Sequence, residues 1–167
     1  MSKYILIFVL IILIVTIVFF QNKNNNQKQT EAPTEQNTLK DDINKGSTWI
    51  SSALNSSGYK ADYSIESLKE IDRFFDEHVE NGEPKKGGLL SESLNSRMFS
   101  LGAYVGETLI NNYGGKWSYD ENDPTDEFKV QVILSDGAII WPMQRVMKRL
   151  KNGKEDSIYG YGVSLKP

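Results

Sequence analysis

The sequence predicts an α+β protein with a single transmembrane helix at its N-terminus. An apolar run opens the chain, yet the mean hydropathy of all 167 residues is only −0.43, so the remainder is polar. In that remainder, helical periodicities come first and strand patterns come later. Because a domain takes roughly 100–200 residues, the length allows one. We expect this domain to be compact, with about four helices packed on a small, mostly antiparallel sheet.

The predicted anchor occupies residues 1–20. Residues 4–20 are apolar except for Tyr4 and Thr16, and as a helix they would span about 25 Å at roughly 1.5 Å per residue. No small-x-small site follows, which argues against a cleaved signal peptide. The short tail before the run favours a single pass through the bacterial cytoplasmic membrane, with the C-terminal domain outside the cytoplasm, although lysines flank both ends.

Two further segments follow the anchor. Residues 21–39 are predicted to be a disordered tether, because their Asn, Gln, Thr and Glu side chains leave almost nothing to bury. Residues 40–167 are predicted to form one α+β domain. Its first helices are expected at 40–56, 64–80 and 91–113, and Ser64 and Ser91 would cap the second and third.

The third of these helices is expected to be central. Gly114 and Gly115 would end it. Gly102 and Gly106 sit one turn apart inside it, and each costs about 1 kcal/mol relative to Ala in a helix interior. We therefore expect another element to pack closely against these two glycines.

Strand patterns occupy the later part of the domain. They are predicted at 116–119, 128–134, 138–141 and 157–164. Asp136-Gly137 between two apolar runs is a strong hairpin signal. Pro142 fits the first turn of a fourth helix, which Gly153 would end.

The composition excludes several kinds of site. With no Cys, the chain has no disulfide, thiolate metal site or cysteine nucleophile. Its single His, His78, lacks helical neighbours suited to a shared metal and is expected on a solvated surface. The acidic loop at 120–127 lacks the Gly of a calcium-binding EF-hand loop. We expect no metal site and no small-molecule cofactor.

Glu107 is the main candidate for a partly buried carboxylate, because the surrounding stretch of the central helix is apolar on nearly every side. A carboxylate in such a place needs a partner. Two structural roles are possible for the carboxylate: an ion pair with Arg145, or a hydrogen bond from the Trp117 indole. The alternative is a general acid or base role for Glu107 in a hydrolase.

Charges in the domain are segregated. Residues 40–167 carry 16 Lys and Arg against 20 Asp and Glu, and residues 62–83 carry eight acids against two bases. A basic stretch follows at 145–154. The two stretches are expected either to neutralise each other or to bind proteins, and the acidic balance excludes nucleic acid as a partner. The candidate protein-binding residues are Glu70, Asp76, Glu77, Lys148 and Arg149.

Three stretches carry a resemblance to a known family. They are Leu-Gly-Ala-Tyr-Val-Gly-Glu at 101–107, Gly-Gly-Lys-Trp at 114–117 and Trp-Pro-Met-Gln-Arg-Val-Met-Lys-Arg-Leu-Lys-Asn-Gly at 141–153. Together they resemble an uncharacterised bacterial family, a domain of unknown function. The resemblance implies a compact α+β domain in which Glu107, Trp117 and Arg145 meet, and it implies no catalytic residue.

Taken together, these features favour binding over catalysis. The function we expect is that of a membrane-anchored, non-catalytic binding domain of the bacterial cell envelope, with a protein partner and with residues 4–20 in the membrane. One alternative is an immunity protein that neutralises a basic toxin through the acidic face at 62–83. The other is a hydrolase that uses Glu107.

Overall fold

The computed structural model describes residues 38–120 and 129–167, which belong to one compact unit, Asn37–Pro167. The helices in it are α2 (Leu39–Ser56), α3 (Leu68–His78), α4 (Leu94–Tyr113), α5 (Pro142–Asn152) and α6 (Ile158–Ser164). Strands β1 (Val79–Glu80) and β2 (Glu83–Pro84) form one antiparallel sheet. Strands β3 (Gly115–Ser118), β4 (Gln131–Leu134) and β5 (Ile139–Ile140) form the other, in the order β3-β4-β5.

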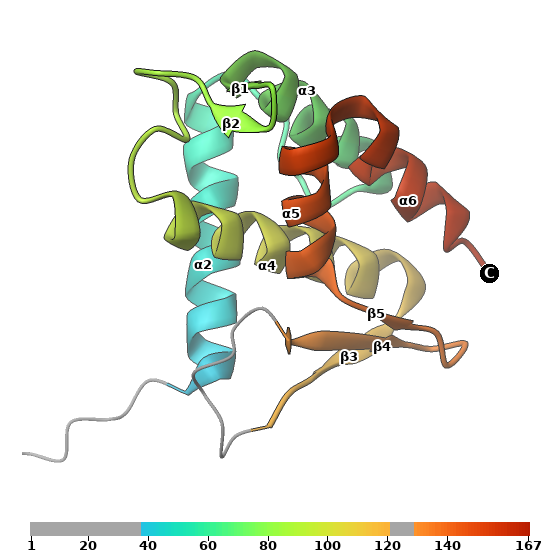
Figure 1. The fold of residues 1–167 in the computed structure, drawn as a ribbon. Helices are drawn as coiled ribbons and strands as arrows, with labels where there is room; N and C mark the ends of the chain where they lie inside the picture. Colours follow the sequence, from blue (N-terminus) through green and yellow to red (C-terminus); the bar gives the residue numbers. More distant parts are fainter. Residues whose placement is uncertain (1–37, 121–128) are drawn as a thin grey trace, which may run out of the picture. The chain divides into compact units, whose positions relative to one another are not determined.

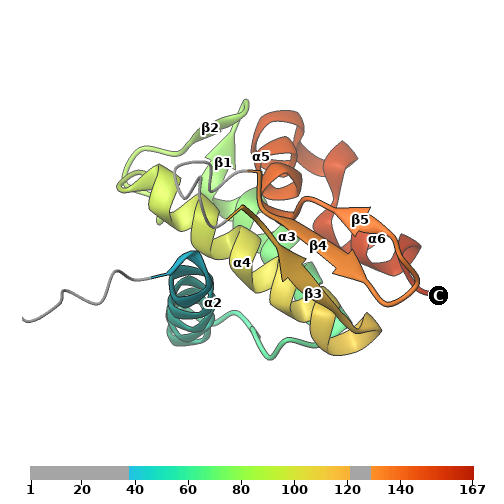
Figure 2. The same ribbon diagram turned by 90° about the horizontal axis from the view of Figure 1, so that it is seen from below.

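Helix α4 is the centre of this arrangement. Every residue from Met98 to Gly106 is buried, so the helix is covered on all sides rather than along one stripe. Helix α2 crosses it, the three-stranded sheet lies along it and α5 packs against it (Figures 1 and 2). The prediction of a central helix over this part of the chain is thus confirmed.

The two glycines of α4 mark its closest contacts. A Cβ atom at Gly102 would lie 2.8 Å from the Cα of Met143, at the start of α5. A Cβ atom at Gly106 would lie 2.0 Å from the Trp117 ring, on β3. Neither position has room for a side chain, which confirms the close packing expected from the sequence.

Local signals explain where several elements begin and end. Thr38 and Asp41 form a reciprocal capping box at the start of α2. Gly114 ends α4 with a φ of 71°, a conformation that glycine adopts without steric cost. The Asp136-Gly137 turn joins β4 to β5, with Ile133 opposite Ile139, so the predicted hairpin is confirmed.

The predicted fold needs a correction. In the described ranges the structure has five α-helices and two small antiparallel sheets, instead of a transmembrane helix followed by about four helices on one sheet. No helix within residues 38–120 and 129–167 is long and apolar enough to cross a membrane. The predicted anchor at 4–20 and the tether up to residue 37 lie outside these ranges, and cellular location stays a prediction.

The fifth helix arises where a strand was predicted. The sequence predicts a strand at residues 157–164, but Ile158–Ser164 is α6, and the Ser157 side chain caps it by accepting from the Gly160 N–H. A side chain distant in sequence also stabilises this helix start: the Asp72 carboxylate accepts the N–H groups of Ile158 and Tyr159. Helix α4 also begins later than predicted, at Leu94, so Ser91 does not cap it.

Candidate functional site

Glu107 and Trp117 lie together where β3 crosses α4. The indole fits into the notch left by Gly106, and its Nε1–H donates to the Glu107 Oε1 at 2.7 Å. Of the two partners left open by the sequence, the structure therefore has the Trp117 indole. This hydrogen bond to a half-buried carboxylate fixes the three-stranded sheet to the central helix.

Arg145 does not join that pair, contrary to expectation. Its guanidinium donates to Asp156 Oδ1 and to the Ser157 carbonyl oxygen, each at 3.0 Å, and lies 4.5 Å from the centre of the Tyr161 ring. It therefore holds α5 to the segment that leads into α6. The acid that attracts it, Asp156, comes only eleven residues later in the chain.

The surroundings of Glu107 do not resemble a hydrolytic site. Two hollows of about 590 and 210 Å³ adjoin its carboxylate, and Asn44 of α2 lines both. Among residues 38–120 and 129–167, their lining contains no His and no second carboxylate. Glycoside hydrolysis usually relies on two carboxyl groups that flank the scissile bond. The geometry thus favours a structural role for Glu107.

Part of the basic stretch at 145–154 pairs with acids of the 62–83 stretch. Arg149 of α5 is only 3% exposed and is bonded to Asp72 and Asp76 of α3. Lys154 and Lys151 pair with Asp76 and Glu83. Arg149 is therefore not available to a partner, and Lys148 is the exposed residue of the predicted basic pair.

The remaining acids of the 62–83 stretch are also paired. Arg73 contacts Glu70 and Glu77, and Lys69 and Lys60 contact Glu66 and Asp62. Within the described part of the chain, Glu80 is the one acid of this stretch without a cation partner. Glu70, Asp76 and Glu77 thus form parts of internal ion pairs rather than an uncompensated acidic surface.

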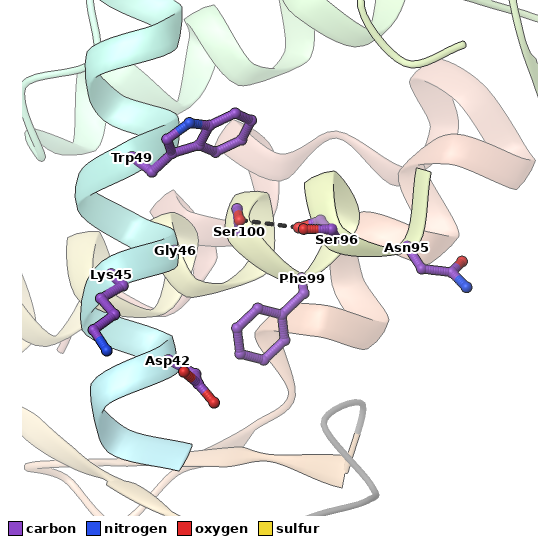
Figure 3. A pocket seen from close by; sticks show the side chains of 8 residues that line it. All are labelled: Asp42, Lys45, Gly46, Trp49, Asn95, Ser96, Phe99 and Ser100. Carbon is purple, nitrogen blue, oxygen red and sulfur yellow. Dashed lines mark hydrogen bonds between the residues drawn. The ribbon is translucent and has the colours of Figure 1, made fainter. Parts of the chain in front are cut away.

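A different surface, between α2 and α4, exposes apolar side chains. Trp49 on α2 is 51% exposed and lines a groove of about 610 Å³ between α2 and the first turns of α4. Figure 3 shows this groove, with Trp49 and Asp42 on the α2 side and Phe99 and Asn95 on the α4 side. Its floor is narrow because Gly46 lets the two helices meet: a Cβ there would be 3.2 Å from the Ser100 hydroxyl.

Trp49 also lines a second hollow, which adjoins the groove. This recess, of about 120 Å³, has the buried side chains of Ile50, Leu54 and Phe74 beneath it. Leu89, which is 41% exposed, and Arg97 also line it. We call the groove and the recess together the Trp49 surface.

His78 positions the Leu89 wall of this recess. Its Nδ1 accepts the Leu89 N–H at 3.3 Å, and its Nε2 lies 3.1 Å from the Tyr59 hydroxyl. The ring also packs 4.9 Å from the Phe74 ring. Burial lowers the pKa of His78 below its ordinary value. The expectation of a solvated surface His is therefore corrected, because the loop after β2 folds back over the ring.

The Trp49 surface is not among the predicted sites, although the sequence carries one signal for it. The buried positions of α2 are Leu39, Ile43, Ser47, Ile50 and Leu54, spaced three and four residues apart. Trp49 is one residue off this stripe, so helical geometry alone directs it away from the core. Leu89 offers no such signal, because it lies in a loop without periodicity.

Comparison with known proteins finds no match: no protein-family model, no curated protein and no solved structure is similar to this chain. The resemblance drawn from residues 101–107, 114–117 and 141–153 stays a prediction.

Proposed function

We propose that this domain is a non-catalytic protein-binding module that holds its partner at the Trp49 surface. The observation that carries the proposal is the half-exposed Trp49, which forms the shared wall of two adjoining hollows. Trp and Arg are the residue types most often found at the energetic centres of protein interfaces, where a pocket buries them. Here Trp49 and Arg97 line one recess.

The charges of the domain favour binding at the Trp49 surface over binding of a basic partner at the acidic residues 62–83. An immunity protein that captures a basic toxin needs acids free to meet it. The acids at 62–83 are instead paired with Lys and Arg of this chain, with Glu80 as the exception among the described residues. Within the part of the chain that the structure describes, no element covers Trp49 or Leu89, and exposed apolar patches of this kind mark interaction sites.

The proposal is tested by selecting a phage-displayed library of random peptides on the full 167-residue chain. Enriched sequences are then synthesised and their affinities measured by calorimetry. Trp49→Ala should weaken binding about 30-fold, since a central Trp contributes roughly 2 kcal/mol or more. Trp141→Ala is the matched control, because Trp141 is 39% exposed but does not line the Trp49 surface.

Two results would overturn the proposal. One is that no peptide is enriched over a selection on an unrelated protein. The other is that enriched peptides bind the Trp49→Ala variant as tightly as the unaltered chain, or lose as much affinity with Trp141→Ala. Circular dichroism of both variants shows whether each remains folded.

A further inference from the structure

The recess beside Trp49 has the size of a single side chain. Its volume of about 120 Å³ is well below the roughly 300–1,000 Å³ of small-molecule sites. Trp49 and Leu89 wall it, and the buried side chains of Ile50, Leu54 and Phe74 lie beneath it. An apolar side chain of a partner fits such a place, because it would cover these carbon atoms and displace water from them.

Arg97 adds a positive charge at the same recess. Its side chain is half-buried and lines the hollow with Trp49 and Leu89. Within residues 38–120 and 129–167, its guanidinium has no hydrogen bond or ion pair, whereas Arg73, Arg145 and Arg149 are each bonded to a carboxylate. A guanidinium offers two parallel N–H groups to a carboxylate, which is the strongest pairing available to it in a protein.

The start of α4 adds to this field. Arg97 lies in the first turn of α4, a helix of 20 residues, and its Ser93 N-cap residue makes no side-chain hydrogen bond to the helix. The positive end of the helix dipole therefore lies beside the guanidinium without compensation from a capping side chain. On α3, which supplies Phe74 to the recess, Glu70 and Glu77 are held by Arg73.

We infer that the partner is a protein segment that places an apolar side chain between Trp49 and Leu89 and a carboxylate, from Asp, Glu or a chain end, on Arg97. This inference rests on the proposed function and adds the chemistry of the partner. The apolar contact supplies burial, and the carboxylate fixes the direction in which the segment lies.

The test extends the peptide selection with charge-altered variants of the full chain. Peptides selected on the unaltered chain should carry Asp, Glu or the free C-terminus within a few residues of an apolar side chain. Arg97→Glu should lower their affinity at least tenfold, and Arg97→Gln should lower it less. A fresh selection on Arg97→Glu should enrich Lys or Arg at the position of the acid. Lys166→Glu, the same charge change at an exposed site after α6, should leave affinity within twofold.

The outcomes separate this inference from the proposed function. Peptides that depend on Trp49 but show no acidic preference, and that bind Arg97→Glu with unchanged affinity, overturn the inference and leave the proposed function standing. An equal loss with Arg97→Glu and Lys166→Glu also overturns it, because the effect is then one of net charge. If no enriched peptide depends on Trp49 for its binding, both the proposed function and the inference are overturned. If the partner segment belongs to a second copy of this chain, the inference stands, and the unaltered chain forms a dimer that Arg97→Glu dissociates.

Discussion

Arg149 and Asp72 lie 77 residues apart in the chain, and their side chains join α5 to α3 through a hydrogen bond of 2.8 Å between Nε and Oδ1. The guanidinium also donates to the Asp72 carbonyl oxygen and to Asp76. The Asp72 carboxylate in turn accepts from the Ser157 hydroxyl and from the first N–H groups of α6. One ion pair therefore connects three helices.

Replacing Arg149 by Met should destabilise the domain by about 1.5–3 kcal/mol, the range for hydrogen bonds to charged groups, because the half-buried Asp72 carboxylate loses its cation. Urea unfolding of the full chain measures the difference. Lys148→Met on the same helix is the control and should change stability by less than about 0.5 kcal/mol, since Lys148 is exposed. Equal effects of the two substitutions would show that the ion pair contributes nothing particular.

Gly106 should not accept a side chain while Trp117 is present. Gly106→Ala places a Cβ within 2.0 Å of the indole, and such overpacking typically costs about 1–3 kcal/mol, even though Ala is the better helix former. In a Trp117→Leu background the same substitution should become neutral or stabilising. A double-mutant cycle by urea unfolding tests this coupling. Additive effects would contradict the contact between the two residues.

Glu107 should behave as a hydrogen-bond acceptor for Trp117. Glu107→Gln keeps a side-chain carbonyl oxygen for the indole N–H and should cost less than about 1 kcal/mol. Glu107→Leu removes the acceptor and should cost about 1.5–3 kcal/mol, the range for hydrogen bonds to charged groups. Thermal unfolding measures both changes. If Glu107→Gln is as damaging as Glu107→Leu, the negative charge has a role that this geometry does not explain.

Most helices and the hairpin could be predicted because short-range signals determine them. The stripe in α2, the glycines after α4 and α5, and the Asp136-Gly137 turn each act within a few residues. The segment 157–164 misleads because its alternation resembles a strand, whereas Asp72, far away in sequence, supplies the hydrogen bonds that start a helix there. Gly162 also allows α6 to pack against Leu68, with 2.5 Å from a Cβ at that position to the Leu68 Cδ1.

The candidate site could be predicted only in part, for a similar reason. The apolar surroundings of Glu107 indicated a partner, and Trp117 was one of two possibilities. Arg145 was the other, and no local pattern reveals that Asp156 and Ser157 bind it instead. The recess requires α2, α3, α4 and the loop with Leu89 to be in place, so its existence follows from the fold rather than from any segment.

Acidification should weaken the fold through His78. Burial holds the pKa of this imidazole below its ordinary value of 6.5, with Lys85 acting in the same direction and Glu77 opposing both. The Tyr59 hydroxyl, which faces Nε2, has a pKa raised to about 12 by burial and by its bond to Glu77, so it stays protonated. Because the unfolded chain binds a proton more readily than the folded one, stability is full above pH 6.5. It falls as the pH drops from there through the folded pKa.

Urea unfolding between pH 8 and pH 5 tests this, with His78→Gln as the control that removes the titrating group. The free energy of unfolding of the unaltered chain should decline relative to the variant below about pH 6.5, since subtraction cancels the carboxylates common to both. The protection of the Leu89 amide against hydrogen exchange, taken relative to the intrinsic rate at each pH, should fall over the same range, because a protonated Nδ1 no longer accepts its N–H. If the difference in free energy of unfolding between the two chains stays flat on acidification, Glu77 offsets burial at this ring. If it grows in favour of the unaltered chain, Glu77 outweighs burial.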